Sequence, residues 1–294
     1  MCGIAGIYST KNISIDDKIL QMLEKLQHRG EDSAGVALYG ILDLEDNEYF
    51  IEIESGKNQE KIEEILGNKI QIEIDTEPPI YSSIYRGKYE ILRKKVSRIS
   101  QLNECKVINA GKAYTIKDKG KVKKLSNYLD EKNIKGTHGI GHTRFSTESE
   151  VNRYHAHPFQ SFARPDVNVV HNGQITNYRE IRENLESDGL IFDTQNDTEC
   201  IAHYIANQLN KGDTLEKALK NSINDMDGPF SFIIAIENGI GVARDSLGLR
   251  PTILAQNNEI FAIASEEIAI RESMAEIEEI KHLKPGEVAT MTGG

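Results

Sequence analysis

The chain opens with the stretch MCGIAGIYS, in which a cysteine at position 2 is followed by a short apolar run. Glycine and polar residues bound this run, which predicts a short buried strand at the very N-terminus. Such a strand constrains the fold, because the first residues of the chain then lie inside a sheet. Cys2 is either a small buried apolar side chain or a nucleophile held at the end of this strand. If Met1 is removed, the freed α-amino group of Cys2 can accept the proton of its own thiol.

The composition is that of an ordinary globular protein. The chain has 294 residues, of which 38% are apolar and 28% charged, enough for one large or two medium domains. No apolar run reaches the roughly 18 residues that a membrane span requires, and no signal peptide is recognisable. The three cysteines, Cys2, Cys105 and Cys200, lack metal-like spacing, so we expect a cytoplasmic protein without a metal site. The net charge of −11 argues against nonspecific nucleic-acid binding.

The order of predicted elements indicates an α+β fold. After the N-terminal strand, residues 14–30 have the apolar spacing of a helix, and SAGVALYG reads as a strand. The second half has helical stretches at 177–189, 196–212 and 213–228, and hairpin strands at 230–245, 251–265 and 279–292. Strand pairs stand beside helix pairs without strict βαβ alternation. This order predicts stacked sheets with helices on the outside.

Residues 41–135 differ from the rest of the chain. They are rich in Glu, Lys and Ile and contain a Tyr-rich stretch, but no catalytic motif. We interpret residues 2–294 as one domain, in which 41–135 are an inserted segment or a partner-docking subdomain. The role of this segment does not follow from its sequence.

Four residues outside that segment offer complementary chemical groups. Arg144, in GHTRFST, is either an exposed arginine at a strand edge or a guanidinium that grips a ligand carboxylate. Asn172 and Gly173 break an apolar strand, either as a plain turn or as donors to an oxyanion. Asp197 is expected to cap a helix, and its carboxylate can also face an ammonium group. Together with Cys2, these groups match an amino acid whose side chain carries a hydrolysable carbonyl.

Two further loops, HRGEDSAG and ARDSLGLRP, are punctuated by glycine and carry Arg and Asp. Taken alone, they indicate salt bridges that stabilise the loops themselves. His203 lies inside a predicted helix, where a core or surface position is more common than a catalytic one.

Several blocks, in order along the chain, resemble the class II glutamine amidotransferases. The blocks are MCGIAGIYS, LQHRGEDSAGVA, GHTRFST, HAHPF, VVHNGQITNYREIRENL, NDTECIAHYI and ARDSLGLRP. They fall within residues 1–40 and 136–290. The members of this family are N-terminal-nucleophile hydrolases, so the resemblance implies a four-layer αββα sandwich.

The resemblance also implies glutaminase chemistry. Cys2, exposed by removal of Met1, would attack the side-chain amide of L-glutamine and form a thioester. Its α-amino group would carry the proton and help to release ammonia, and water would then hydrolyse the thioester to glutamate. Asn172 and Gly173 match the oxyanion-hole positions of the family.

Other positions match the family's glutamine pocket. Arg144 matches the arginine that binds the substrate carboxylate, and Asp197 the residue that holds the substrate α-amino group. Thr147 matches a threonine that lines the pocket. Arg29 lies in the loop near the nucleophile and is assigned to the substrate-binding residues.

The acceptor of the ammonia is expected on another polypeptide. Glucosamine-6-phosphate synthase, asparagine synthetase and amidophosphoribosyltransferase carry the acceptor site after the glutaminase part, and this sequence shows no motif of those sites. A long segment after DSAG resembles the separate glutaminase subunit of archaeal-type glutamate synthases. The implied partner is a synthase subunit that holds FMN and iron–sulfur clusters and aminates 2-oxoglutarate, with no cofactor on this chain.

Three alternatives remain open from the sequence. The chain also resembles the glutaminase subunit of N-methylglutamate synthases. It is compatible with a glutaminase for amidophosphoribosyltransferase-like chemistry. The third alternative is a non-catalytic regulatory subunit that binds glutamine, retains Arg144 and Asp197, and lacks an activated nucleophile.

Overall fold

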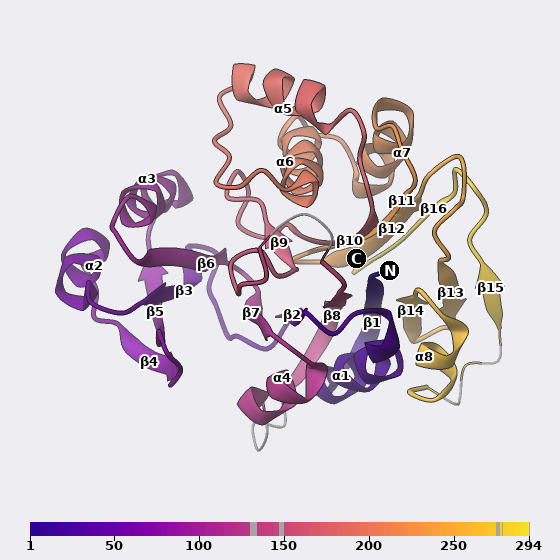
Figure 1. Ribbon diagram of the computed structural model, residues 1–294, viewed down its shortest axis with the longest axis horizontal. Helices are drawn as coiled ribbons and strands as arrows, with labels where there is room; N and C mark the ends of the chain where they lie inside the picture. The colour runs from indigo at the N-terminus through magenta and orange to yellow at the C-terminus, as the bar shows by residue number, and fades with distance from the viewer. Residues whose placement is uncertain (130–133, 147–149, 275–276, 278, 294) are drawn as a thin grey trace.

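The computed structural model describes residues 1–129, 134–146, 150–274, 277 and 279–293. Two β-sheets are stacked between two layers of helices, and a separate lobe extends from one side of the stack (Figure 1). This is the αββα arrangement that the order of elements predicts. No helix in the described ranges has both the length and the apolar character needed to cross a membrane.

The first sheet is built around the antiparallel pair β1 and β8. In spatial order its seven strands are β15 (Ile280–His282), β13 (Ile253–Gln256), β14 (Ile260–Ala264), β1 (Gly3–Ser14), β8 (Lys135–Arg144), β2 (Ser33–Tyr39) and β7 (Tyr114–Lys119). Every neighbouring pair is antiparallel. The N-terminal strand therefore lies in the middle of the sheet, as its apolar sequence predicts.

The second sheet has five antiparallel strands. In spatial order they are β16 (Val288–Thr292), β12 (Gly239–Arg244), β11 (Phe230–Ile236), β10 (Asn168–Gly173) and β9 (Phe159–Gln160). Its outer face carries α5 (Tyr178–Ser187), α6 (Asp197–Asn210) and α7 (Leu215–Asp225). The first sheet is covered by α1 (Ile15–Lys25), the short 3₁₀ helix η1 (Gln27–Arg29), α4 (Val122–Leu129) and α8 (Glu267–Arg271).

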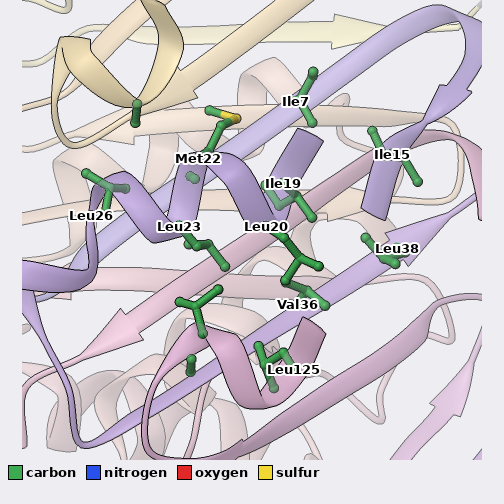
Figure 2. Close-up of a cluster of buried hydrophobic side chains, with 14 of the residues drawn as sticks. Ile7, Ile15, Ile19, Leu20, Met22, Leu23, Leu26, Val36, Leu38 and Leu125 are labelled. Carbon is green, nitrogen blue, oxygen red and sulfur yellow. The ribbon is translucent and has the colours of Figure 1, made fainter. Parts of the chain in front are cut away.

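Helix α1 shows how the apolar pattern builds the outer layer. Its buried residues recur at intervals of three and four, which puts them on one face of the helix. Figure 2 shows this face against side chains of β1, β2 and α4; the residues of the cluster include Ile7, Ile15, Ile19, Met22, Leu23, Leu26, Val36, Leu38 and Leu125. A second cluster fills the space between the sheets, with Ile4, Ile140 and Ile263 facing Val170, Ile233 and Val242.

The lobe has a sheet and an apolar core of its own. It consists of β3 (Glu48–Ser55), α2 (Gln59–Leu66), β4 (Gln71–Ile74), β5 (Ile80–Arg86), α3 (Tyr89–Ser100) and β6 (Cys105–Gly111), and its strand order is β4-β5-β3-β6. Both helices pack on the same cluster of sheet residues. We call residues 48–111 the inserted lobe. The rest of the segment 41–135 includes β7 and α4, which belong to the sandwich.

Truncation of the α1 core is expected to destabilise the protein. Leu23 lies on the inner face of α1 and is fully buried. The change Leu23→Ala should lower the free energy of unfolding by about 2–5 kcal/mol, because the cavity left behind cannot fully collapse. The matched change Ile191→Ala, at a side chain that is 67% exposed, should alter it by less than about 0.5 kcal/mol. Urea denaturation followed by circular dichroism measures both; equal effects would contradict the packing described.

Candidate active site

A cavity of about 770 Å³ lies where ends of strands from both sheets meet the start of α6. The predicted site residues that line it are Cys2, Arg144, Asn172, Gly173 and Asp197. They come from both sheets and from a helix, and the fold brings them together although they are up to 195 positions apart (197 − 2) in the sequence. Thr147 lies outside the described residues.

The start of β1 holds Cys2 beside the end of β8. Gly3 pairs with Thr143 across the two antiparallel strands, so the preceding Cys2 lies next to Arg144. The packing around Gly3 leaves no room for a side chain. A Cβ there would lie 2.6 Å from the Thr143 hydroxyl oxygen and 2.9 Å from Cβ of Leu26. The backbone that positions Cys2 is therefore tightly packed.

Arg29 is hydrogen-bonded to the backbone of Cys2. Its Nε donates a hydrogen bond to the backbone carbonyl of Cys2 at 2.9 Å, and its Nη1 lies 2.6 Å from Oε1 of Glu266. Arg29 is buried and is not among the described residues that line the cavity. Its place in this structure differs from the substrate-binding place predicted for it, because the guanidinium is bonded to the backbone of Cys2.

The thiol of Cys2 is half-buried and reaches the cavity. Burial raises the pKa of this thiol, and the nearby positive charges of the N-terminal amine, Arg144 and Arg29 only partly oppose the effect. The Sγ atom lies 3.7 Å from the carbonyl oxygen of Phe145. Met1 also lines the cavity. Because Met1 precedes Cys2, the backbone nitrogen of Cys2 is part of a peptide bond. With Met1 in place, the thiol is protonated near neutral pH and its own nitrogen cannot act as a base.

Asn172 offers a hydrogen-bond donor that the described part of the protein does not use. It lies at the end of β10, its side chain is 2% exposed, and its Nδ2 has no partner among the described residues. A buried donor without an acceptor costs about 1–3 kcal/mol, so its retention at a cavity indicates a ligand acceptor. The adjacent Gly173 has φ +140°, and a Cβ there would lie 2.1 Å from the Pro229 carbonyl oxygen. Glycine is thus required at this turn.

Asn196, not Asp197, caps helix α6. The side chain of Asn196 accepts a hydrogen bond from the Thr198 backbone at 2.9 Å, so the cap predicted for Asp197 is wrong. Oδ2 of Asp197 accepts from the Ile175 backbone at 3.0 Å, and Oδ1 lies 3.6 Å from Nδ1 of His171. Burial opposes ionisation of Asp197, but His171 and these hydrogen bonds outweigh it and lower the pKa. A negative charge therefore faces the cavity.

Several histidines lie at the cavity that are not among the site residues predicted from the sequence. His155, His157 and His171 line the cavity, and His142 stacks on His157 with ring centroids 4.0 Å apart. Burial lowers the pKa of His142 to about 3, so the ring is neutral. Its Nε2–H donates to the His171 carbonyl at 3.0 Å, which ties β8 of one sheet to β10 of the other. Within the described ranges, no group of three or more His, Cys, Asp or Glu is placed to hold a metal ion.

Arg250 is another lining residue that the sequence did not reveal. It belongs to ARDSLGLRP, whose charges were assigned to salt bridges within the loop. Its Nε is buried and has no partner among the described residues. The only sequence signal for Arg250 was that its block is one of those that resemble the family. The spacing of residues within the block does not indicate a chemical role for any of them.

Comparisons with known proteins agree with this geometry. Residues 142–272 match the family model described as a glutamine amidotransferase domain. A provisionally assigned glutamine amidotransferase of Methanothermobacter thermautotrophicus is 47% identical over 98% of this chain and 98% of its own length. The glutamine amidotransferase-like protein GlxB of Rhizobium meliloti is 31% identical over 90% of this chain and 89% of its own length.

Longer proteins match over only part of their length. The chain spans 47% of the amidophosphoribosyltransferase of M. thermautotrophicus, at 26% identity. Among solved structures, the glutamine phosphoribosylpyrophosphate amidotransferase of B. subtilis aligns with a TM-score of 0.64 and 22% identity, over 99% of this chain and 47% of that one. At this identity the alignment shows the fold alone. The whole-length relatives and the αββα sandwich place this chain in the class II glutamine amidotransferases, with the fold of the N-terminal-nucleophile hydrolases.

Proposed function

We propose that this chain is a glutaminase subunit that hydrolyses L-glutamine through a thioester on Cys2 and passes the ammonia to a separate synthase subunit of the glutamate synthase type. One observation carries the glutaminase part. The thiol of Cys2, the guanidinium of Arg144, the ionised carboxylate of Asp197 and the unused amide donor of Asn172 line a single cavity.

The charged groups suit the two ends of an amino acid. Arg144 presents a buried guanidinium, which binds a carboxylate through paired charge-assisted hydrogen bonds. Asp197, whose pKa is lowered, offers a negative charge to the α-ammonium group. An amino acid held at both of these groups directs its side chain to the remaining reactive group of the cavity, the thiol of Cys2.

The reaction requires that Met1 first be removed. The free α-amino group of Cys2, with an ordinary pKa of about 7.7–8.0, then accepts the thiol proton as Sγ bonds to the amide carbon of glutamine. Asn172 and Gly173 donate hydrogen bonds to the oxyanion of the tetrahedral intermediate. The carbon–nitrogen bond breaks, and ammonia leaves with the proton from the amine. Water then hydrolyses the thioester to glutamate and restores the thiol.

Substitution of the nucleophile tests the mechanism directly. Cys2→Ala should abolish glutaminase activity while L-glutamine still binds, because Arg144 and Asp197 remain. Isothermal titration calorimetry measures binding, and coupled detection of glutamate measures turnover. Mass spectrometry of the active protein should show Cys2 as its first residue. Full activity in Cys2→Ala would refute the thioester, and a retained Met1 on inactive, glutamine-binding protein would favour a regulatory subunit.

The two kinds of site residue should affect different kinetic constants. Asn172→Ala should lower kcat by about 10²–10³-fold with little change in KM, because the oxyanion forms only during the reaction. Asp197→Asn keeps an oxygen for the Ile175 backbone but loses the charge. It should raise KM by about 10- to 100-fold, since a hydrogen bond to a charged group contributes roughly 1.5–3 kcal/mol. Steady-state kinetics distinguish the two, and a pure KM effect of Asn172→Ala would contradict its assignment.

The whole-length relatives support an acceptor site on another polypeptide. The chain covers 98% and 89% of the two relatives described above, which leaves little of either protein for a synthase domain. The amidophosphoribosyltransferase, in contrast, extends for about as much again. The long segment after DSAG, which contains the inserted lobe, supports the glutamate synthase type. In this proposal FMN and the iron–sulfur clusters belong to the partner.

Reconstitution tests the proposed partner. Mixed with a glutamate-synthase-type subunit that carries FMN and iron–sulfur clusters, the chain should transfer the amide nitrogen of ¹⁵N-labelled glutamine to 2-oxoglutarate. The Cys2→Ala protein is the control and should support only synthesis from free ammonia. Absence of complex formation and of ¹⁵N-glutamate would reject this partner. Label on N-methylglutamate or on a phosphoribosylamine product would identify one of the other acceptors instead.

A further inference from the structure

One wall of the cavity is a segment without regular structure. Residues 150–158, between β8 and β9, form neither helix nor strand, and they contribute His155 and His157 to the cavity lining. No ladder of backbone hydrogen bonds fixes such a segment. Its position depends on side-chain contacts from the elements beside it.

The inserted lobe holds this segment at consecutive residues. Glu54 of β3 and Lys106 of β6 are direct partners across the lobe's sheet. The carboxylate of Glu54 forms an ion pair with Nη1 of Arg153. Nζ of Lys106 lies 4.8 Å above the ring centroid of Tyr154, a cation–π contact. A single cross-strand pair of the lobe therefore contacts two successive residues of the cavity wall.

Arg153 joins the lobe to the sandwich. Arg153 is 7% exposed, and its Nη2 donates to Oδ2 of Asp118 at 3.0 Å and to Oγ1 of Thr76 at 3.2 Å. Glu54 and Thr76 belong to the lobe, whereas Asp118 belongs to β7 of the sandwich. A buried guanidinium with carboxylates on both sides keeps its charge compensated and its direction fixed.

The contacts continue into the cavity lining. The ring of Tyr154 meets the ring of His155 edge-on, with centroids 5.6 Å apart. From the side of the sandwich, Nζ of Lys117 donates to the carbonyl oxygens of Ala156 and Pro158, each at 3.1 Å. The segment 150–158 is thus held between β7 and the lobe. The lobe contacts Arg153 and Tyr154, the two residues directly before His155.

We propose that Arg153 and Tyr154 are positioning residues through which the inserted lobe sets the wall of the glutamine cavity. The proposal rests on the glutaminase function proposed above. The lobe takes part in glutamine turnover although it carries no group that touches substrate. Loss of its contacts leaves Cys2 and Asp197 in place but displaces His155 and His157. It also affects Arg144, whose Nη1 donates to the Glu150 carbonyl of the same segment at 3.1 Å.

Two substitutions on the lobe release the wall without touching the cavity. Glu54→Gln removes the negative charge opposite Arg153, whose ion pair with Asp118 remains. Lys106→Met removes the positive charge of an exposed side chain from the ring of Tyr154. Glu54→Gln should lower kcat/KM for glutamine about tenfold, since small displacements at a distance from the chemistry have large kinetic effects. Lys106→Met should lower it about threefold, and Lys106→Arg should restore it by keeping the cation on the ring.

A matched control separates positioning from folding. Glu48→Gln removes a carboxylate from the other end of β3, where the side chain is 11% exposed, compared with 18% for Glu54, and pairs with Arg86 inside the lobe. It should leave kcat/KM unchanged. Thermal unfolding midpoints of the two Gln variants should be alike, and alkylation of Cys2 by iodoacetamide should proceed at the wild-type rate in both.

The outcomes distinguish this proposal from the glutaminase function itself. Glutamine binding is measured by calorimetry in the Cys2→Ala background, so it does not require turnover. A wild-type chain without glutaminase activity and without glutamine binding would reject the proposed function. Active wild-type protein with unchanged kcat/KM and unchanged glutamine affinity in both Glu54→Gln and Lys106→Met would overturn the positioning role. Equal losses in Glu54→Gln and Glu48→Gln would also overturn it.

Discussion

The antiparallel pairing of β1 with β8 is the contact on which the site depends. It brings the N-terminus into the middle of a sheet, where Gly3 packs against Thr143 and leaves Cys2 beside Arg144. The same β8 strand reaches across to the second sheet through the hydrogen bond from His142 to the His171 carbonyl. Cys2 and Asn172, the proposed nucleophile and oxyanion donor, are thus carried by different sheets, and their alignment depends on the stacking of the sandwich.

Much of this site was predictable from the sequence because its residues stand where apolar patterns end. A buried strand that starts or stops at a polar motif places that motif at the end of the strand, which holds for Cys2, Arg144 and Asn172. The helix that follows Asp197 was equally clear from its spacing. Its cap was not, because Asn196 and Asp197 are adjacent and both residue types favour that position. Only the backbone geometry decides between them.

The remaining features depend on contacts that no local pattern encodes. Glu54 and Arg153 are 99 positions apart, and their pairing requires both the fold of the lobe and its seat against the sandwich. Arg29 was assigned to substrate because its loop lies near the nucleophile, but its guanidinium is turned towards the backbone of Cys2. Side-chain direction of this kind follows from packing around a long flexible residue, which sequence periodicity does not describe.

The place at which the lobe joins the sandwich has a consequence for how such a protein can change over time. β2 and β7 are neighbours in the first sheet, and Leu38 near the end of β2 pairs directly with Tyr114 at the start of β7. The lobe therefore lies within the loop of a β2–β7 hairpin. The entropic cost of closing such a loop rises only slowly with its length. Variation in its size, and in its surface away from Arg153 and Tyr154, leaves the strand order intact, so this part of the molecule can diversify while the sandwich is inherited unaltered.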